Sequence, residues 1–358
     1  MIRHWRWDLP LSAMAVLLLL AVGVVAFADD SKAPESVVPE EMPEGYFQII
    51  TSHPAMYTQF EFTIIAEESK FSREDMQGAA QEAFAAIDRL EDLISTWRRG
   101  TQASRINSEG AQHSVGVAPT VLNLVESCVR YWRDTDKAFD ITVGPLVELW
   151  RTCKMEKRLP TEEELTAARA VVGSDKLVVV PDDHSVGFAT LGMRLDFGGI
   201  AKGWALDRAH QVLEEYGVSC ALLDAGTSSM LAIGAPPGKP GWTVQLRHPY
   251  NKELLEEAII RDEALSTSGY ALDFFEVNGK KYGHIIDPRT GMPTQGTLYA
   301  MAIGSSGSQT EALSKGFFIN GIDWAQRYCE QHPDTRGLIV PDPGPGESPK
   351  PVRINMAK

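Results

Sequence analysis

The sequence has few cysteines, and they lack the spacings that bind zinc. Its four cysteines, in 358 residues, form no CxxC pair, and none follows the N-terminal apolar run as a lipid-attachment cysteine would. Two of them, Cys128 and Cys220, lie in apolar runs, where cysteine behaves as a small buried hydrophobe. We therefore expect no zinc site, no lipid anchor and no obligatory disulfide.

Positive charge is also scarce. The chain carries 34 Lys and Arg against 48 Asp and Glu, a formal net charge of −14, and no basic segment is interleaved with aromatic residues. Such a chain is repelled by phosphate backbones, so we expect no nucleic-acid partner. The composition, 44% hydrophobic and 23% charged, is otherwise that of a folded soluble protein, and no internal repeat is visible.

A single long apolar run lies at the N-terminus. Residues 1–28 begin with Arg3 and Arg6, continue with the uncharged stretch 9–28 and end in Ala-Phe-Ala, the pattern of an export signal cleaved before Asp29. About 20 apolar residues also suffice to cross a bilayer, so an uncleaved membrane anchor is the alternative. Either way we expect a periplasmic or otherwise extracytoplasmic protein, with anchoring to the inner membrane as the second form.

The remaining chain divides by composition. Residues 29–45 are rich in Pro, Glu and Ser and predict a flexible acidic tether, which leaves residues 46–358 as the folded domain. Apolar periodicity and capping residues predict helices that begin at Ser72, Pro119 and Thr161 and others over about 203–216, 309–319 and 322–332. Short β-type runs lie at 60–66, 176–180, 185–189, 193–197, 218–223, 229–233, 242–247, 257–262, 274–277 and 281–286.

Several of these strands are joined by connections too short for helical crossovers. The sheets should therefore be mixed but largely antiparallel and packed with helices, which is an α+β class.

The densest motif is LDFGGIAKGWALD at residues 195–207, where a predicted strand ends in a glycine-rich turn that enters a helix. Backbone N–H groups at such a turn and the positive end of the helix favour an anion, and Lys202 adds a full charge. By itself the motif is a weak signal, because its spacing matches neither a Walker A loop nor GxGxxG. A glycine-rich connection with an incidental lysine is the structural alternative.

Three further motifs accompany it: AFDITVGPL at 138–146, TSG at 267–269 and HIIDPRTGMP at 284–293. Together and in this order they make residues 55–340 closely similar to the ApbE-like family, the FAD:protein FMN transferases. The resemblance implies an ApbE-like (T-fold-like) architecture. It also implies an enzyme that splits FAD, joins FMN through a phosphoester to a Ser or Thr hydroxyl of a partner flavoprotein and releases AMP, with Mg²⁺ assisting. The acceptor would be a membrane-associated redox subunit.

The resemblance gives roles to individual residues. It makes His284 the catalytic residue, a general base for the acceptor hydroxyl, and Ile285 an apolar contact to the cofactor. It places Met56 and Trp97 in the flavin cleft, where the Trp97 ring would stack on the isoalloxazine. The structural alternatives are an ordinary core or surface position for His284 and a core position for Ile285.

Two other segments would contact the flavin nucleotide. Ala138, Phe139 and Asp140 correspond to one of them, and Asp196 and Lys202 flank the glycine-rich turn in the other. The structural alternatives are a core position for Phe139 and, for Asp140, a cap on the turn that follows it.

The implied magnesium ligands are the Gly199 carbonyl and Glu311, and here the sequence departs from the family pattern. The family has an Asp and a Thr where this chain has Glu311 and Lys315. An ammonium replaces an oxygen ligand, which puts the metal in doubt. The alternatives are a solvated Glu–Lys pair at i, i+4, or a lysine that takes over a charge contact at the pyrophosphate. Lesser departures lie at Thr227 and at Tyr270.

Two rival functions use the same residues. With water as the nucleophile, the site would be an FAD pyrophosphatase that yields FMN and AMP. The departure at Lys315 also suggests a catalytically degenerate flavin-binding protein.

Overall fold

The computed structural model describes residues 35–37, 39, 41–226, 228–247, 253–269, 274–343 and 349–356. The chain divides into two compact units, residues 1–32 and 33–358, and all described residues belong to the second. The predicted signal or anchor, residues 1–28, lies outside them. Among the helices that are described, none is both long and apolar enough to cross a membrane.

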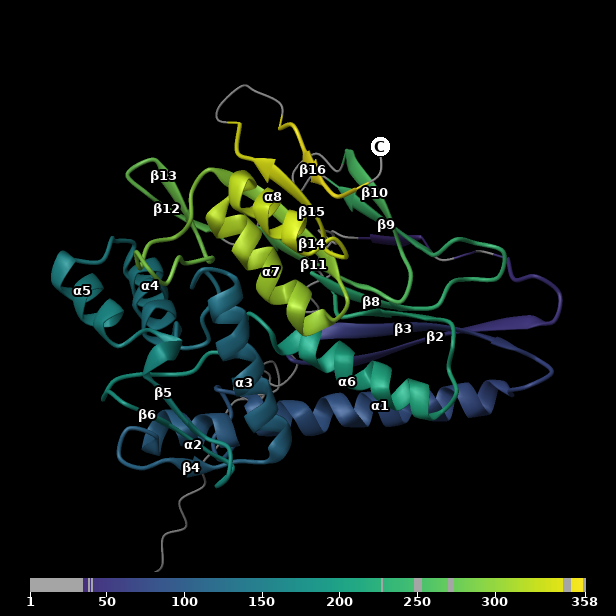
Figure 1. The fold of residues 1–358 in the computed structure, drawn as a ribbon, viewed down its shortest axis with the longest axis horizontal. Helices are drawn as coiled ribbons and strands as arrows, with labels where there is room; N and C mark the ends of the chain where they lie inside the picture. Colours follow the sequence, from purple (N-terminus) through teal and green to yellow (C-terminus); the bar gives the residue numbers. More distant parts are fainter. Residues whose placement is uncertain are drawn as a thin grey trace, which may run out of the picture. The chain divides into compact units, whose positions relative to one another are not determined.

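A large sheet organises this unit, and its neighbouring strands are antiparallel wherever they are described (Figure 1). In spatial order it contains β16 (Val352–Ile354), β15 (Arg336–Pro341), β14 (Thr297–Gly304), β11 (Ala264–Gly269), β8 (Ser229–Ile233), β7 (Ala221–Asp224), β3 (Thr58–Glu67) and β2 (Tyr46–Ala55). The α+β prediction with largely antiparallel sheets is confirmed.

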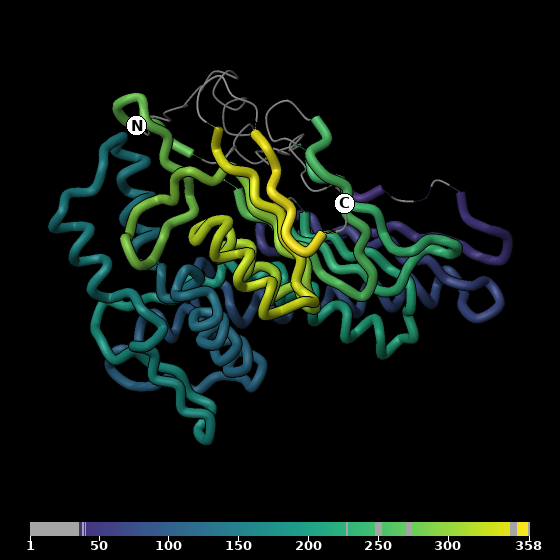
Figure 2. The backbone as a smooth tube through the Cα atoms, turned by 45° about the horizontal axis from the view of Figure 1, so that its top comes forward, coloured from purple at the N-terminus to yellow at the C-terminus, as the bar shows by residue number. Residues whose placement is uncertain are grey.

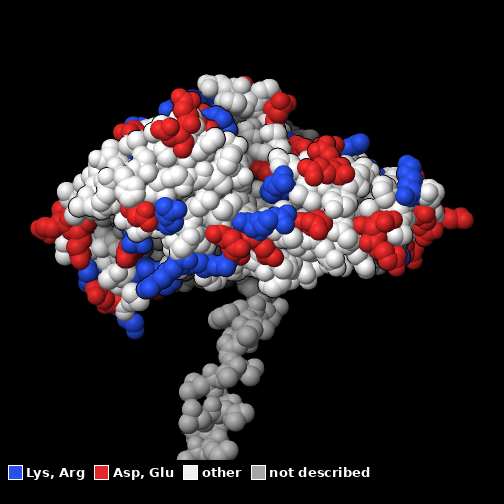
Figure 3. Space-filling model, turned by 90° about the horizontal axis from the view of Figure 1, so that it is seen from below, with Lys and Arg blue, Asp and Glu red and all other residues white. Residues whose placement is uncertain are grey.

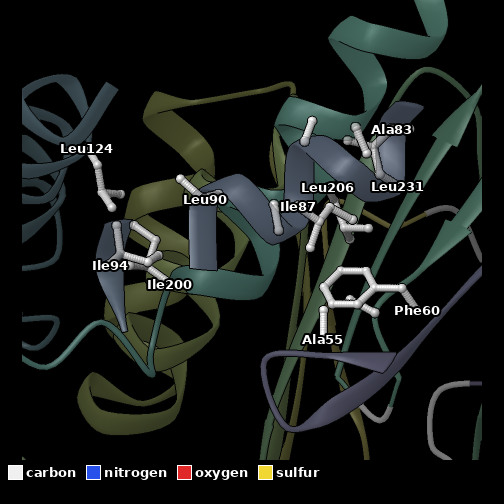
Figure 4. Packing of buried hydrophobic residues seen from close by; sticks show 14 of the residues in the cluster. Ala55, Phe60, Ala83, Ile87, Leu90, Ile94, Leu124, Ile200, Leu206 and Leu231 are labelled. Atoms are coloured by element: carbon white, nitrogen blue, oxygen red, sulfur yellow. The ribbon is translucent and has the colours of Figure 1, made fainter. Parts of the chain in front are cut away.

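Four helices cover one face of the sheet: α1 (Arg73–Ile94), α6 (Ala201–Glu215), α7 (Gly307–Asn320) and α8 (Ile322–Gln331). The predicted capping box of Ser72 and Asp75 starts α1, whose buried stripe includes Ala83, Ile87 and Leu90. Figure 4 shows this stripe packed against Leu206 of α6 and against the sheet. The apolar face of α1 therefore fixes α6, the helix that follows the glycine-rich turn.

The opposite face is covered by a small sheet of β1 (Glu35–Val37), β9 (Trp242–Arg247) and β10 (Leu254–Ile260). Trp242 and Val244 of β9 are buried in one apolar cluster with Met301 of β14. The strand β1 lies within the predicted tether. At residues 35–37 the structure differs from that prediction, because backbone pairing with β9 orders a segment that has few apolar side chains of its own.

The remaining elements form a satellite region. It contains α2 (Gln102–Glu109), α3 (Pro119–Asp134), α4 (Gly144–Glu156), α5 (Glu162–Ala170), the 3-10 turn η1 (Ser174–Lys176), and strands β4 (Val115–Gly116), β5 (Leu177–Val180), β6 (Ser185–Phe188), β12 (Phe274–Val277) and β13 (Lys280–Gly283). Figures 1 and 2 place the β12–β13 hairpin beside α4 and α5, where Trp150 stacks on Tyr282.

One predicted strand is wrong. Residues 193–197 make a single parallel bridge, Val143 to Arg194, and otherwise run as irregular backbone. The alternation of Met193, Leu195 and Phe197 is real, because all three side chains are buried, but this short segment packs inside the domain without a strand ladder beside it.

Candidate active site

The glycine-rich turn is held in the apolar core from both sides. Phe197 before it and Ile200 after it are fully or almost fully buried. In Figure 4, Ile200 lies beside Ile94 of α1. Asp196 also shapes the turn, since its Oδ1 accepts a hydrogen bond of 2.7 Å from the Gly198 N–H. The turn is therefore a fixed backbone feature at the start of α6.

The last glycine of the motif has a packing role. A Cβ on Gly203 would collide with the Gly307 carbonyl, so this glycine lets α6 and α7 touch at their N-terminal ends. Asp207, one turn further along α6, accepts hydrogen bonds of 2.6 and 2.9 Å from the Gly307 and Ser308 N–H groups at the start of α7. Burial raises the pKa of Asp207, and these hydrogen bonds oppose the rise.

The motif at 138–146 lies against the glycine-rich turn. The Asp196 N–H donates to the Ile141 carbonyl at 2.7 Å. A Cβ placed on Gly199 would be 3.7 Å from Cε2 of Phe139, so this ring borders the turn, while its implied contact with the flavin nucleotide stays a prediction. Ala138 and Phe139 are buried, and Phe139 belongs to the main apolar core, which also satisfies its structural alternative.

A chain of hydrogen bonds joins Lys202 to Glu311. The Lys202 Nζ donates to the Ser228 hydroxyl, and Ser228 Oγ lies 3.2 Å from Ser229 Oγ. Ser229 in turn donates to Glu311 Oε1 at 2.6 Å. The other carboxylate oxygen of Glu311, Oε2, is buried without a hydrogen-bond partner among the described residues. A buried carboxylate oxygen without a donor is costly and marks a place where a cation or a donor would be favoured.

The half-buried side chain of Lys315 lies directly over the glycine-rich turn. A Cβ on Gly199 would be 2.9 Å from Cε of Lys315, and the Lys315 Nζ donates to the Glu311 carbonyl at 3.1 Å. Burial lowers the pKa of Lys315, Glu311 opposes this, and the like charge of Lys202 adds to it. We call Lys202 and Lys315 the lysine pair. The solvated i, i+4 alternative is wrong, because Glu311 is only 2% exposed.

Met56 and Trp97 lie near the C-terminal end of α1. Met56 occupies the turn between β2 and β3 with a left-handed φ of 50°, and its N–H donates to Glu91 of α1 at 2.9 Å. Trp97 follows α1, is 60% exposed, and has the Arg151 guanidinium 4.8 Å from its ring centre. Ile200 packs at the same end of α1, and a flavin contact of Met56 and Trp97 stays a prediction.

Asp140 makes a buried hydrogen-bonded cap. Its carboxylate accepts from the N–H and hydroxyl of Thr142, at 2.8 and 2.7 Å, and from the N–H and hydroxyl of Ser174, at 3.0 and 2.8 Å. Burial raises the pKa of Asp140, and these bonds oppose the rise. We call this arrangement the Asp140 cap. It corresponds to the structural alternative for Asp140, and a flavin contact at this residue stays a prediction.

The motif at 284–293 is a loop fastened to α4 and to the end of α3. Its Asp287 pairs with Arg289 at 2.8 Å, and Arg289 also donates to the Asp136 carbonyl at 3.1 Å. The Trp150 indole donates to the Gly291 carbonyl at 2.7 Å. His284, at the end of β13, is exposed and so accessible to a substrate. Ile285 is buried in the apolar cluster that also contains Leu313 and Phe317, so it has the core position that was its alternative.

A cavity of about 470 Å³ lies beside the Asp140 cap, lined by Trp132, Lys137, Asp140, Thr166, Arg169, Ala170, Val172, Gly173, Asp175, Lys176, Pro288 and Arg289. Two of its basic side chains are already engaged. Lys176 donates to the Ala170 and Val172 carbonyls, both at 2.8 Å, and Arg289 is paired with Asp287. Contacts within the protein therefore hold the Lys176 and Arg289 side chains in place at the cavity wall.

The structure brings Phe139, Asp196, Gly199, Lys202 and Glu311 together, all of which were expected at the site. It also adds Ser228 and Ser229, which the sequence motifs did not single out. Their signal was a pair of hydroxyl residues where β8 begins, two residues after Gly226. That glycine has a φ of 81° and no room for a Cβ beside Thr58, so it sets the path of the loop. Thr227 and Tyr270, the lesser departures, lie outside the described residues.

The positive charge of the lysine pair is local. The whole chain has a formal charge of −14, and the face drawn in Figure 3 mixes basic with acidic side chains. An anion at the glycine-rich turn would therefore be held by these nearby groups, since long-range attraction by an acidic protein is unfavourable.

Known proteins match this fold and sequence. The ApbE family model covers residues 56–339. The FAD:protein FMN transferase of Vibrio cholerae is 29% identical over 288 residues, which are 79% of this chain and 84% of the relative. That of Klebsiella pneumoniae is 30% identical over 234 residues, 65% of this chain and 72% of the relative. The crystal structure of the ApbE protein from Thermotoga maritima superimposes with a TM-score of 0.75 at 27% identity, covering 86% of this chain and 97% of its own.

The fold and the site together define an α+β domain in which a glycine-rich turn, two lysines and a buried carboxylate face one another. With the family match over most of its length, the chain belongs to the ApbE family.

Proposed function

We propose that the protein is an FAD:protein FMN transferase, an enzyme that uses FAD as substrate and a protein as acceptor. The main supporting observation is that motifs far apart in the sequence are brought together. The Asp196 N–H donates to the Ile141 carbonyl, which joins two of them directly. Arg289 donates to the carbonyl of Asp136, two residues before the 138–146 motif, and the Thr267 N–H donates at 2.8 Å to the carbonyl of Ser228, whose hydroxyl accepts from Lys202. The curated relatives that carry this name support the assignment.

The reaction exchanges one phosphorus–oxygen bond for another. An acceptor hydroxyl oxygen bonds to the phosphorus on the flavin side of FAD, the phosphoanhydride bond breaks, and AMP leaves with the bridging oxygen. Such a transfer depends on positioning and on neutralising phosphate charge, which the glycine-rich turn and Lys202 supply. His284, exposed at the end of β13, accepts the hydroxyl proton as general base.

Magnesium, which the family resemblance implies, fits these residues poorly. The free oxygen of Glu311 suits a cation, but Mg²⁺ demands near-octahedral oxygen ligation and Lys315 supplies an ammonium in place of one ligand. Across the described part of the chain, no group of three or more His, Cys, Asp or Glu is arranged to hold a metal. We assign no step of the transfer to Mg²⁺.

The place of action follows from the N-terminal sequence. Residues 1–28 have the pattern of an export signal or anchor, so the enzyme would act in the periplasm or on the outer side of the inner membrane. Its acceptor would then be an exported or membrane-associated redox subunit with an accessible Ser or Thr.

The test is the mass of an acceptor protein after incubation with FAD. The acceptor of the Vibrio cholerae transferase serves as the probe, and the same acceptor with its target hydroxyl residue replaced by Ala serves as the control. We expect the first to gain the mass of FMN with release of AMP, and the second to stay unchanged. FMN and AMP released without any mass gain would identify an FAD pyrophosphatase. FAD binding without cleavage would identify a degenerate flavin-binding protein.

A further inference from the structure

We infer that the Lys315 ammonium takes the place of a divalent cation in this chain, so that the FAD diphosphate binds here without a divalent metal. The inference rests on the proposed function, because it concerns the same substrate. It follows from the position of Lys315, from the donors around it and from the balance of charge.

Lys315 packs against Gly199, the residue expected to supply a carbonyl ligand. Its Cε and Cδ would be 2.9 and 3.3 Å from a Cβ on Gly199, so the lysine stem occupies the space beside the Cα of this glycine. The ammonium is held there by its hydrogen bond of 3.1 Å to the Glu311 carbonyl. The fold thus already places a cation over the glycine-rich turn.

The donors around this point suit an ammonium better than Mg²⁺. Glu311 is the one carboxylate of the implied ligand set, and its Oε1 already accepts from Ser229. Only Oε2 remains without a partner among the described residues. An ammonium carries three donors and accepts irregular geometry, whereas Mg²⁺ gives up its waters reluctantly and needs regular ligation.

The charges also balance without a metal. The lysine pair contributes two positive charges, which match the negative charges of Glu311 and of Asp196 at the glycine-rich turn, so no metal is needed to neutralise these carboxylates. Lysine is an established phosphate binder as a point charge, and the N-terminal end of α6 adds a favourable dipole. A divalent cation placed beside both ammoniums would instead be repelled.

The test measures FAD affinity by flavin fluorescence in a chelator and in Mg²⁺, for the wild type, Lys315→Thr and Lys315→Met. The wild type should bind FAD with affinities that agree within about twofold in the two buffers. Lys315→Thr should bind at least about tenfold more weakly in the chelator and recover in Mg²⁺, because a hydroxyl ligand is restored. Lys315→Met keeps the apolar stem, so it should weaken in both buffers without recovery. Thermal melts establish that each variant is folded.

Three results would overturn the inference: a wild type that loses FAD by tenfold or more in the chelator, a Lys315→Thr protein that matches the wild type in both buffers, or tight Mg²⁺ binding by the wild type in calorimetry. Failure of the folded wild type to bind FAD in either buffer would instead contradict the proposed function, and the inference with it. Binding that requires Mg²⁺ separates the two, since it removes only the inference.

Discussion

Asp140 and Glu311 are both buried carboxylates, but their surroundings differ in one respect. The Asp140 carboxylate accepts four hydrogen bonds, two from N–H groups and two from hydroxyls. These bonds join the segments around Thr142 and Ser174. Glu311 keeps one oxygen without a partner among the described residues and lies beside Lys315. The comparison teaches that burial alone does not mark a binding site. A buried polar atom that lacks a hydrogen-bond partner and lies beside a charged side chain is the better mark of a binding site.

The largest effect should come from His284, which belongs to neither carboxylate region. His284→Ala should slow FMN transfer by roughly 10²–10⁴-fold, the usual contribution of a positioned general base, while FAD affinity stays the same. Acceptor mass against time measures the first quantity and flavin fluorescence the second. Asp287→Asn is the matched comparison, because Asp287 is paired with Arg289 and should act only on loop order. An unchanged rate in His284→Ala would remove this histidine from the mechanism.

In the region of Glu311, Lys202→Ala should weaken FAD binding by about 1.5–3 kcal/mol, which is roughly tenfold or more, because a charge-assisted contact to phosphate is lost. Stability should change little. The exposed Lys70, paired with Glu67, provides Lys70→Ala as a control for the loss of one positive charge. Equal FAD dissociation constants for wild type and Lys202→Ala would leave the glycine-rich turn with a structural role only.

In the Asp140 cap, Asp140→Asn should lower the free energy of unfolding by about 1.5–3 kcal/mol, because an amide cannot accept all four hydrogen bonds of the cap. Denaturant unfolding measures the change. The FAD affinity of the folded protein should stay near that of the wild type. A weakened affinity with unchanged stability would show that Asp140 contacts the flavin nucleotide, as the family resemblance implied.

The smallest effect concerns pH. Burial raises the pKa of Asp140, so the folded protein takes up this proton at a higher pH than the unfolded chain does. Protonation therefore favours the folded state. The contribution of Asp140 to stability should increase as the pH falls through its folded pKa toward the ordinary value of 3.8. Asp140→Asn should lack this component in unfolding curves measured between neutral and acid pH, and an identical pH profile in both proteins would contradict the assignment.

Much of this site could be predicted from the sequence because its motifs are local. The 195–207 motif predicts its own turn and helix, although the strand expected before the turn does not form, and capping pairs such as Thr161 with Glu164 form as expected. The closure of the site could not be predicted, since it depends on pairings between distant segments. The contact of Lys315 with Gly199 and the link from Ser229 to Glu311 arise only when α7 packs on β8 and α6.

Two differences between the predicted and observed strands have a physical cause. β14 is buried along its whole length and so lacks the alternation that marks a half-exposed strand. Conversely, residues 193–197 alternate without forming a strand, because the main chain there bonds to irregular neighbours. Burial pattern predicts which side chains enter the core more reliably than it predicts backbone pairing.

The most direct test of the contrast between the two carboxylate regions is the rise in melting temperature that FAD produces in three proteins: the wild type, Lys202→Ala and Asp140→Asn. A ligand that binds only the folded state stabilises it by RT ln(1 + [L]/Kd), so at a fixed FAD concentration the rise in melting temperature measures FAD affinity. We predict that Asp140→Asn melts lower than the wild type but shows the same rise with FAD, and that Lys202→Ala melts like the wild type but shows a reduced rise. A full rise in Lys202→Ala together with a lost rise in Asp140→Asn would contradict this account.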